Sequence, residues 1–304
     1  MVKISNNDDD EESISDNLDI EKELDEEKPD EKLSLEKKSE TDSSGIFEEE
    51  TPGRKSVSIG AWGERGFMDA ANDNEEFQNH LRECFKKFGL NYDGEISAYK
   101  ESKEKKTDIV VNVGETHIGT NIKTSTKRSS QGADRRWLEV WKEKLNMPEN
   151  MYDIMKAGIL RKAREGRSGK FILEEDREII EKFFIAKKEE IVRECFTKNE
   201  ENLDVMVIND VRNKKFYLYK MDDFLNFLDD NMSDNTTLSN KGYPWLGDFI
   251  KMQRKCGDGN YKKYPKTDYR HPSNQIQFKV TPVQCAEYIE KNNLLKSHII
   301  EYEL

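Results

Sequence analysis

The stretch of residues 107–125, TDIVVNVGETHIGTNIKTS, constrains the fold more than any other part of the chain. Apolar residues alternate in it with polar or small ones, which is typical of β-strands that bury one face. In its middle, Gly114 and Glu115 suit the two central positions of a tight turn that prefers glycine first. The stretch therefore predicts a β-hairpin with Gly114 and Glu115 at its tip.

The expected turn determines which residues of the two strands lie opposite each other. Val110 then pairs with Gly119, and Asp108 pairs with Asn121. Because side chains alternate between the two faces of a strand, Asp108, Asn121 and Lys123 share one face. Carboxylate and amide oxygens can hold a hard divalent cation, and a lysine beside them can orient or deprotonate water and neutralise phosphate charge. The pattern indicates phosphodiester hydrolysis; the alternative is an ordinary surface hairpin with solvated charges.

These residues resemble the PD-(D/E)XK nuclease superfamily, and type II restriction endonucleases in particular. In that family an Asp on one strand precedes a D/E-x-K triplet on the next. Asp108 matches the first acid and Lys123 matches the lysine, whereas Asn121 stands in the place of the second acid and departs from the pattern. The resemblance implies Mg²⁺ as the cofactor, with Asp108 and Asn121 as metal ligands and Lys123 acting on water and phosphate. An amide brings no negative charge, so either another acid compensates or the metal site is weaker.

A helix is expected before the hairpin. Asp73 or Asn74 can cap it, and its apolar residues recur at intervals of three and four: Phe77, Leu81, Phe85 and Phe88. In the resembled family a glutamate on the helix before the catalytic hairpin often completes the metal site, and Glu76 is the acid predicted for that role. The alternative is that Glu76, in the first turn, only stabilises the helix through its dipole.

Two basic regions indicate contacts with DNA. The first follows Lys123 and offers hydroxyl groups and cations suited to phosphates, and its predicted DNA-binding residues are Lys127, Arg128, Arg135 and Arg136. The second spans residues 245–295, where glutamine and arginine side chains on two probable strands could read base edges; its candidates are Gln253, Arg254, Lys255, Gln275 and Gln277. The alternatives are a solvated loop in the first region and a basic hairpin without a partner in the second.

The formal net charge of −12 is concentrated at one end of the chain. Residues 1–50 contain 20 Asp and Glu against 6 Lys, a net charge of −14. This segment has almost no aromatic residues, so it cannot bury enough apolar surface to offset chain entropy. We expect a disordered acidic tail at residues 1–52, which either keeps the protein in solution or competes with DNA for a basic cleft.

The rest of the chain, residues 53–304, is predicted to form one nuclease domain. Its fold class is α/β (α+β), with a central mixed β-sheet flanked by helices as in restriction endonucleases. Residues 135–200 have a helical pattern, and residues 203–221 predict a second hairpin. A closing helix is expected at residues 282–295, with three apolar residues in the core: Ala286, Ile289 and Leu294.

The predicted function is a Mg²⁺-dependent endonuclease of double-stranded DNA, and the resemblance implies a site-specific type II restriction enzyme. It also implies a homodimer and a companion DNA methyltransferase. The alternatives are a repair or recombination nuclease that recognises DNA structure, and a non-catalytic DNA-binding protein with an acidic regulatory tail. The four cysteines form no CxxC pair, and neither a signal pattern nor a membrane-spanning stretch is present, so a cytoplasmic protein without a membrane partner is expected.

Overall fold

The computed structural model describes residues 52–102, 105–126, 130–166, 168–198, 200–232, 236–257 and 261–302. The expected acidic tail and two predicted phosphate contacts, Lys127 and Arg128, lie outside these residues. The chain divides into two units, and the second, Gly53–Leu304, holds the elements described below except Pro52, the first residue of the first helix. Of the helices in the described part, none is long and apolar enough to cross a membrane.

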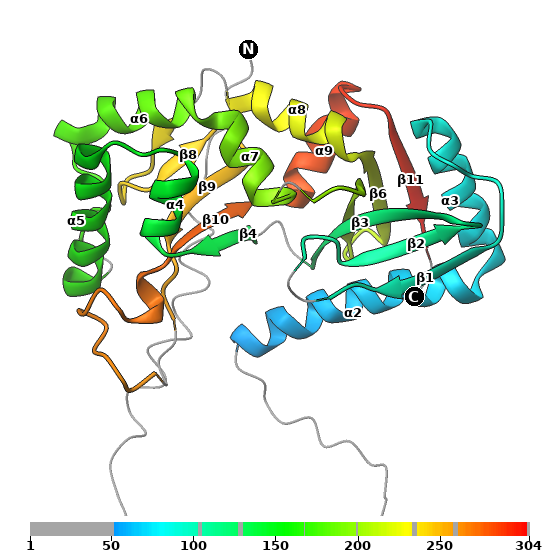
Figure 1. Ribbon diagram of the computed structural model, residues 1–304, viewed down its shortest axis with the longest axis horizontal. Coiled ribbons are helices and arrows are strands. Elements are labelled where there is room, and N and C mark those ends of the chain that lie inside the picture. The colour runs from blue at the N-terminus through cyan, green and yellow to red at the C-terminus, as the bar shows by residue number, and fades with distance from the viewer. Residues whose placement is uncertain are drawn as a thin grey trace, which may run out of the picture. The chain divides into compact units, whose positions relative to one another are not determined.

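A six-stranded mixed sheet carries the predicted hairpin. Among the described strands its neighbours are antiparallel except β3 and β5, which run parallel. Their order is β1-β2-β3-β5-β6-β11, with β1 at Ile96–Lys100, β2 at Ile109–Val113, β3 at Thr116–Ser125, β5 at Leu203–Asp210, β6 at Lys215–Lys220 and β11 at Ser297–Glu301 (Figure 1). The predicted mixed sheet flanked by helices is confirmed.

The hairpin of β2 and β3 has the predicted turn and register. Val110 pairs with Gly119, and the ladder begins at the pair of Ile109 and Thr120. Gly114 has a φ of 59°, in the left-handed region where a residue with no Cβ is favoured. The turn that the sequence indicates thus fixes the relative position of the two strands.

Helices α2 (Pro52–Asp73) and α3 (Glu75–Phe88) pack on one face of this sheet. The predicted N-cap of α3 is confirmed, because the Asn74 side chain accepts a hydrogen bond of 2.9 Å from the N–H of Phe77. The rings of Phe67 and Phe77 meet edge to face, with centroids 5.3 Å apart. Burial of these aromatic side chains holds the two helices against the strands.

The opposite face of the same sheet belongs to a second and larger hydrophobic core. Alternate residues of β5 divide between the two: Val205 and Val207 face α2 and α3, whereas Met206 and Ile208 face the larger core. Helices α7 (Lys188–Phe196), α8 (Met221–Met232) and α9 (Pro282–Asn292) contribute to the larger core. The continuous apolar run of β5 is explained by burial on both faces.

The larger core also covers one face of a five-stranded antiparallel sheet. Its order is β4-β10-β9-β8-β7, with β4 at Gln131–Arg136, β10 at Ile276–Val280, β9 at Ile250–Arg254, β8 at Pro244–Leu246 and β7 at Thr237–Leu238. Helices α4 (Leu138–Lys144), α5 (Glu149–Glu165) and α6 (Arg177–Ala186) supply its apolar cover. In this cover Trp141 lies edge to face on Phe278, with ring centroids 4.7 Å apart.

Two local expectations differ from the structure. The basic segment after β3, for which no strand is predicted, contains strand β4, whose pairing with β10 supplies backbone hydrogen bonds that the local sequence does not reveal. Leu294 was expected in the core but is 45% exposed, because α9 ends at Asn292, two residues before it. Ala286 and Ile289, on the same helix, are buried as expected.

Candidate active site

The carboxylate of Asp108 is fixed at the start of the hairpin. Its backbone N–H donates to the Thr120 carbonyl at 2.8 Å, and its Oδ2 accepts the N–H of Ile122 at 2.7 Å. The carboxylate therefore takes the place that a main-chain carbonyl would occupy in a continued ladder. It binds the N–H that lies between the two candidate residues of β3, Asn121 and Lys123, rather than merely facing Asn121 across the strands.

Asp108 and Lys123 perturb each other's ionisation. Burial raises the pKa of the Asp108 carboxyl, and the Lys123 ammonium and the Ile122 N–H offset only part of that shift. Burial likewise lowers the pKa of Lys123, against the opposing effect of Asp108. An acid and a base whose pKa values both move toward neutrality are typical of functional sites, because each can change protonation near the working pH.

Asn121 is held in the same region by the segment before Asp108. Its side chain is 2% exposed, and its Nδ2 donates to the Lys106 carbonyl. Its Oδ1 is buried and has no hydrogen-bond partner within the described part of the chain. A buried amide oxygen without a partner is costly, so this atom is suited to receive a ligand.

An acid that the sequence prediction overlooked, Glu64 of α2, acts on both ionisable groups. It raises the pKa of Asp108 and of Lys123, and it forms an ion pair with Lys100 of β1. The preceding residue, Gly63, allows α2 to approach β3 closely, since a Cβ there would lie 2.0 Å from the Oγ1 of Thr124. Close packing of the helix at Gly63 therefore brings Glu64 to the end of the hairpin.

Glu76, the acid predicted to complete the site, is exposed in the first turn of α3. Together with Glu75 it provides negative charge at the N-terminus of that helix, where such charge is favourable. The electrostatic partners that shift the pKa of Asp108 and Lys123 include Glu64 and not Glu76. The metal role of Glu76 remains a prediction.

The segment that leads into Asp108 is clamped by carboxylates. Glu200 accepts hydrogen bonds from the N–H groups of Lys106 and Thr107, and also from the Thr107 hydroxyl at 3.0 Å. The Lys106 ammonium forms an ion pair of 2.8 Å with Asp134 of β4. These contacts restrict the backbone beside Asp108 and link the hairpin to the five-stranded sheet.

The oxygen donors of this region fit a hard divalent cation. Asp108 and Glu64 offer carboxylates, and Asn121 offers its unpartnered amide oxygen. Mg²⁺ prefers oxygen ligands and is commonly bound by one or two carboxylates together with water and phosphate. Two carboxylates and one amide oxygen are therefore the donors that this region could offer such a cation.

No protein-family model and no curated protein matches the chain. Among solved structures, it is similar to the crystal structure of restriction endonuclease MspI in complex with its cognate DNA. The TM-score is 0.50 at 16% sequence identity, and the match covers 75% of this chain and 91% of that chain. The chain has a restriction-endonuclease-like fold. At this identity the likeness shows the fold alone, so any chemistry depends on the residues of this chain.

Within this restriction-endonuclease-like fold, three predicted DNA contacts form a row across the five-stranded sheet. Gln277 of β10 pairs with Gln253 of β9 on one side and with Arg135 of β4 on the other. Cross-strand partners share a face, so the three side chains project from the same side of the sheet. Lys251 and Lys279 are partners on that side as well. We call these five residues the polar face.

Arg254 and Arg136, both predicted to contact DNA, lie on the opposite, buried side. Arg254 is 6% exposed, and its guanidinium donates to Asn274 Oδ1 at 2.6 Å and to Ser273 Oγ at 2.9 Å. Arg136 forms ion pairs with Asp134 at 2.9 Å and with Glu194 at 2.5 Å. These bonds give both arginines a structural role, because a contact with DNA would require breaking them.

The last two predicted DNA contacts flank the strands of the polar face. Lys255 follows β9 and Gln275 precedes β10, and the Lys255 N–H donates to the Gln275 carbonyl at 2.8 Å. Both side chains are half-buried. They extend the pairing of β9 and β10 by one more pair, and each lies two residues from a glutamine of the polar face, Gln253 or Gln277.

Proposed function

We propose that this chain is a Mg²⁺-dependent endonuclease of double-stranded DNA, a site-specific type II enzyme of the PD-(D/E)XK superfamily. The observation that carries the proposal is the joint placement of Asp108, Asn121 and Lys123 at one end of the hairpin. A half-buried carboxylate of raised pKa, an unpartnered amide oxygen and a lysine of lowered pKa lie there. A surface hairpin with merely solvated charges would have none of these three properties.

In the proposed reaction Lys123 acts as the general base. Burial favours its neutral amine, which can accept a proton from the water that attacks the phosphorus. The bond between phosphorus and the leaving sugar oxygen breaks, and that oxygen gains a proton from solvent. When protonated, the same side chain neutralises part of the phosphate charge.

Mg²⁺, when bound, supplies a Lewis acid that stabilises negative charge on the phosphate oxygens. Asp108, Asn121 and Glu64 would hold it through oxygen atoms. Asp108 is kept in position by the Ile122 N–H, and Asn121 by the Lys106 carbonyl. Glu64 supplies the negative charge that an amide at position 121 lacks.

The polar face is proposed to bind the DNA that is cut. It combines three cations with two glutamines and contains no acid. Glutamine can form paired hydrogen bonds with adenine, and arginine with guanine, whereas lysine suits phosphates. We assign base reading to Gln253 and Gln277, which are adjacent across β9 and β10.

A homodimer and a companion DNA methyltransferase are part of this proposal. Cutting both strands of a duplex at one site is simplest with two copies of the active site. A cell that holds a site-specific nuclease also needs a way to protect its own DNA. Sedimentation of the protein with a duplex that it cuts would distinguish one copy from two.

The deciding experiment incubates the full-length protein with a long linear DNA, with and without Mg²⁺. Discrete fragments that appear only with Mg²⁺, and not with Asp108→Ala, are expected. Cutting confined to branched or flapped DNA would instead favour a structure-specific repair nuclease. DNA binding without cutting in either Mg²⁺ or Mn²⁺ would reduce the chain to a DNA-binding protein.

A further inference from the structure

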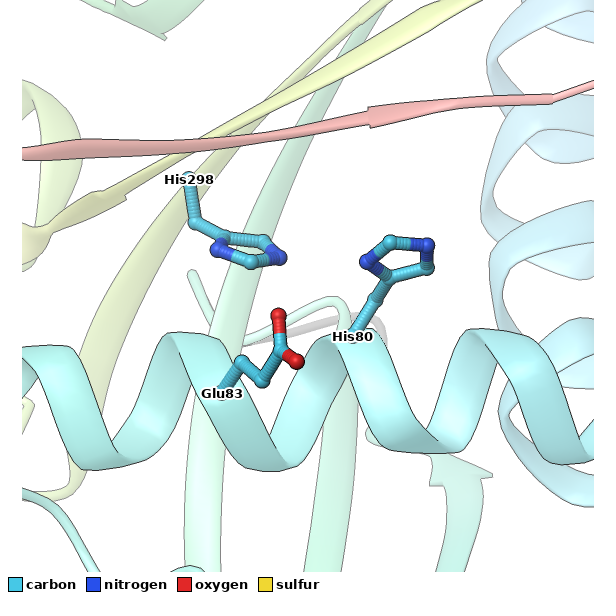
Figure 2. Close-up of side chains that lie close together, drawn as sticks. All are labelled: His80, Glu83 and His298. Carbon is cyan, nitrogen blue, oxygen red and sulfur yellow. The ribbon is translucent and has the colours of Figure 1, made fainter.

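Two histidines and a glutamate meet between α3 and the edge strand β11, away from the hairpin site. His80 and Glu83 project from α3, and His298 projects toward them from β11 (Figure 2). The potential ligand atoms of the three side chains all lie within 4.8 Å of one another. Among the described residues this is the group of three or more histidine, cysteine and acidic side chains that could hold a metal ion, whereas the hairpin site has only two acids beside its amide.

The fold requires these residues to face each other. His80 and Glu83 are three positions apart on a helix, so they share a face. His298 pairs with Leu218 of β6, and Leu218 belongs to the core between the sheet and α3. Because cross-strand partners point to the same side, His298 points to the side of the sheet that α3 covers.

The state of His298 suits a metal ligand. Its Nε2 is buried and lacks a hydrogen-bond partner among the residues that the structure describes. The ring lies 5.7 Å from that of His80 at an interplanar angle of 56°, so the two rings are not stacked. An imidazole nitrogen that lacks a partner can bind a metal ion, and such binding would satisfy it.

The chemistry of the three donors selects the metal. Two imidazoles and one carboxylate suit Zn²⁺ and similar transition metals, whereas Mg²⁺ prefers oxygen ligands alone. With zinc–ligand bonds of about 2.0–2.2 Å, tetrahedral donors are about 3.3 Å apart. The separations between the ligand atoms, all within 4.8 Å, must therefore shorten by up to about 1.5 Å, a change within the reach of rotation about the side-chain bonds of His80 and Glu83. Water would complete the coordination.

We propose that His80, Glu83 and His298 bind one Zn²⁺ ion, which fastens the edge strand β11 to α3. The site differs from the hairpin site in place as well as in ligands, since β5 and β6 separate β11 from β3 in the sheet. One nearby group opposes the ion: the ammonium of Lys87 donates to the Ser297 carbonyl at 2.5 Å. That bond holds the positive charge against the backbone of β11.

Isothermal titration of the full-length, untagged protein with ZnCl₂ in excess Mg²⁺ tests the proposal. We expect one equivalent of Zn²⁺ to bind and the melting temperature to rise. His298→Gln and His80→Gln should each weaken binding by at least about tenfold, since even residues that only orient ligands contribute that much. The matched control is His117→Gln, which removes an exposed histidine outside the group.

Co²⁺ provides an independent readout. Wild type and His117→Gln should show the absorption bands of tetrahedral Co²⁺, and His80→Gln should not. The proposal is overturned if wild type and both ligand variants bind Zn²⁺ with the same affinity and the same rise in melting temperature. Mg²⁺-dependent DNA cutting should be unchanged in His80→Gln, so failure here is distinguishable from failure of the proposed nuclease function.

Discussion

At the residue scale, Asp108 is held between two strands by its backbone N–H, which donates to the Thr120 carbonyl, and by its carboxylate. It uses a side-chain oxygen where the strand would use a carbonyl, so the hydrogen bond to the Ile122 N–H persists only with an acceptor of this length. The hydrogen bond lowers the pKa of the carboxyl, burial raises it, and burial has the larger effect. The fold thus holds this carboxylate in a place where its ionised form is less favoured than in water. Such a cost is characteristic of functional groups.

Asp108→Asn should abolish cutting and leave the fold intact. The amide oxygen can still accept the Ile122 N–H, but the negative charge needed at the metal is lost. A loss of about a thousandfold or more in the single-turnover cutting rate is expected, with DNA affinity in Ca²⁺ nearly unchanged. Asp93→Asn, at an exposed acid, is the control. Substantial cutting by the Asp108 variant would remove the assignment of the hairpin as the active site.

The cutting rate should rise with pH. Asp108 must be ionised, and activity is lost as pH falls through its raised pKa; Lys123 must be neutral, and activity is gained as pH rises through its lowered pKa. Both effects have the same sign, so the rate should reach its half-maximum below the ordinary lysine pKa of 10.5. Lys123→Arg stays protonated, so it should lose the part of this rise that depends on Lys123 and keep only the part at lower pH that depends on Asp108. A pH-independent rate in the wild type would exclude Lys123 as the base.

Glu64→Gln and Glu76→Gln separate the two candidate acids. Glu64 acts electrostatically on Asp108 and Lys123, whereas Glu76 is exposed at the start of α3. We expect Glu64→Gln to raise the Mg²⁺ concentration needed for half-maximal cutting by about tenfold, and Glu76→Gln to leave it unchanged. The opposite outcome would restore Glu76 as the supporting acid.

At the scale of elements, local patterns predicted the hairpin but not the helix that completes its site. The turn at Gly114 and the alternation on both sides of it involve residues that are close in the sequence, so a local pattern can show them. Helix α2 was overlooked because its glycines resemble a loop. Its buried residues Gly63, Phe67 and Ala71 recur every four positions, which was the available signal. The function of Gly63 depends on Thr124 of β3, and no local pattern contains that contact.

Strand alternation could have corrected one prediction. Gln253 and Arg254 are consecutive in β9, so their side chains point to opposite faces. Both were predicted to read bases, although only one of them can lie on the polar face. The same argument applies to Arg135 and Arg136 once β4 is known to be a strand. That strand was not predictable from its own residues, because its partner β10 lies more than a hundred residues away.

The adjacent arginines of β4 are a matched pair for an experiment. Arg135→Ala should weaken DNA binding, lower the salt dependence of the affinity by about one phosphate contact, and leave stability unchanged. Arg136→Ala removes one of the two cations that pair with each of the buried acids Asp134 and Glu194 and leaves Lys106 and Lys144, so the free energy of unfolding should fall by about 1–3 kcal/mol. Urea denaturation and DNA titration at several salt concentrations measure both. Equal effects of the two variants on stability would contradict the assigned faces.

At the scale of the whole molecule, charge is divided between the segments of the chain. Residues 1–50 carry a net charge of −14, and the remaining residues carry +2. The sequence alone shows this division, whereas the arrangement of two sheets around a shared core depends on pairings such as β3 with β5, which join distant parts of the chain. Long-range pairings of this kind are not encoded by local periodicity.

Deletion of residues 1–50 tests whether the acidic segment competes with DNA. If it does, the affinity of the remaining chain for DNA should rise several-fold at low ionic strength, and the gain should disappear at high salt, where charges are screened. A segment of equal length rich in Gly and Ser is the control for chain length. Equal affinities of the intact and shortened proteins at low salt would leave the segment without a role in DNA binding.

The edge strand β11 also contacts a helix that is far from it in the sequence. Lys87 of α3 bonds the Ser297 carbonyl across a sequence separation of 210 residues. Contacts between residues so far apart in the sequence tend to form late, because a long loop must close before they can contribute stability. We therefore expect an intermediate in which β6 is already paired with β5 but its other edge is bare. A bare edge of this kind can pair with a strand of another chain. The refolding yield should therefore fall with increasing protein concentration, unless residues 297–301 pair with β6 before another chain does.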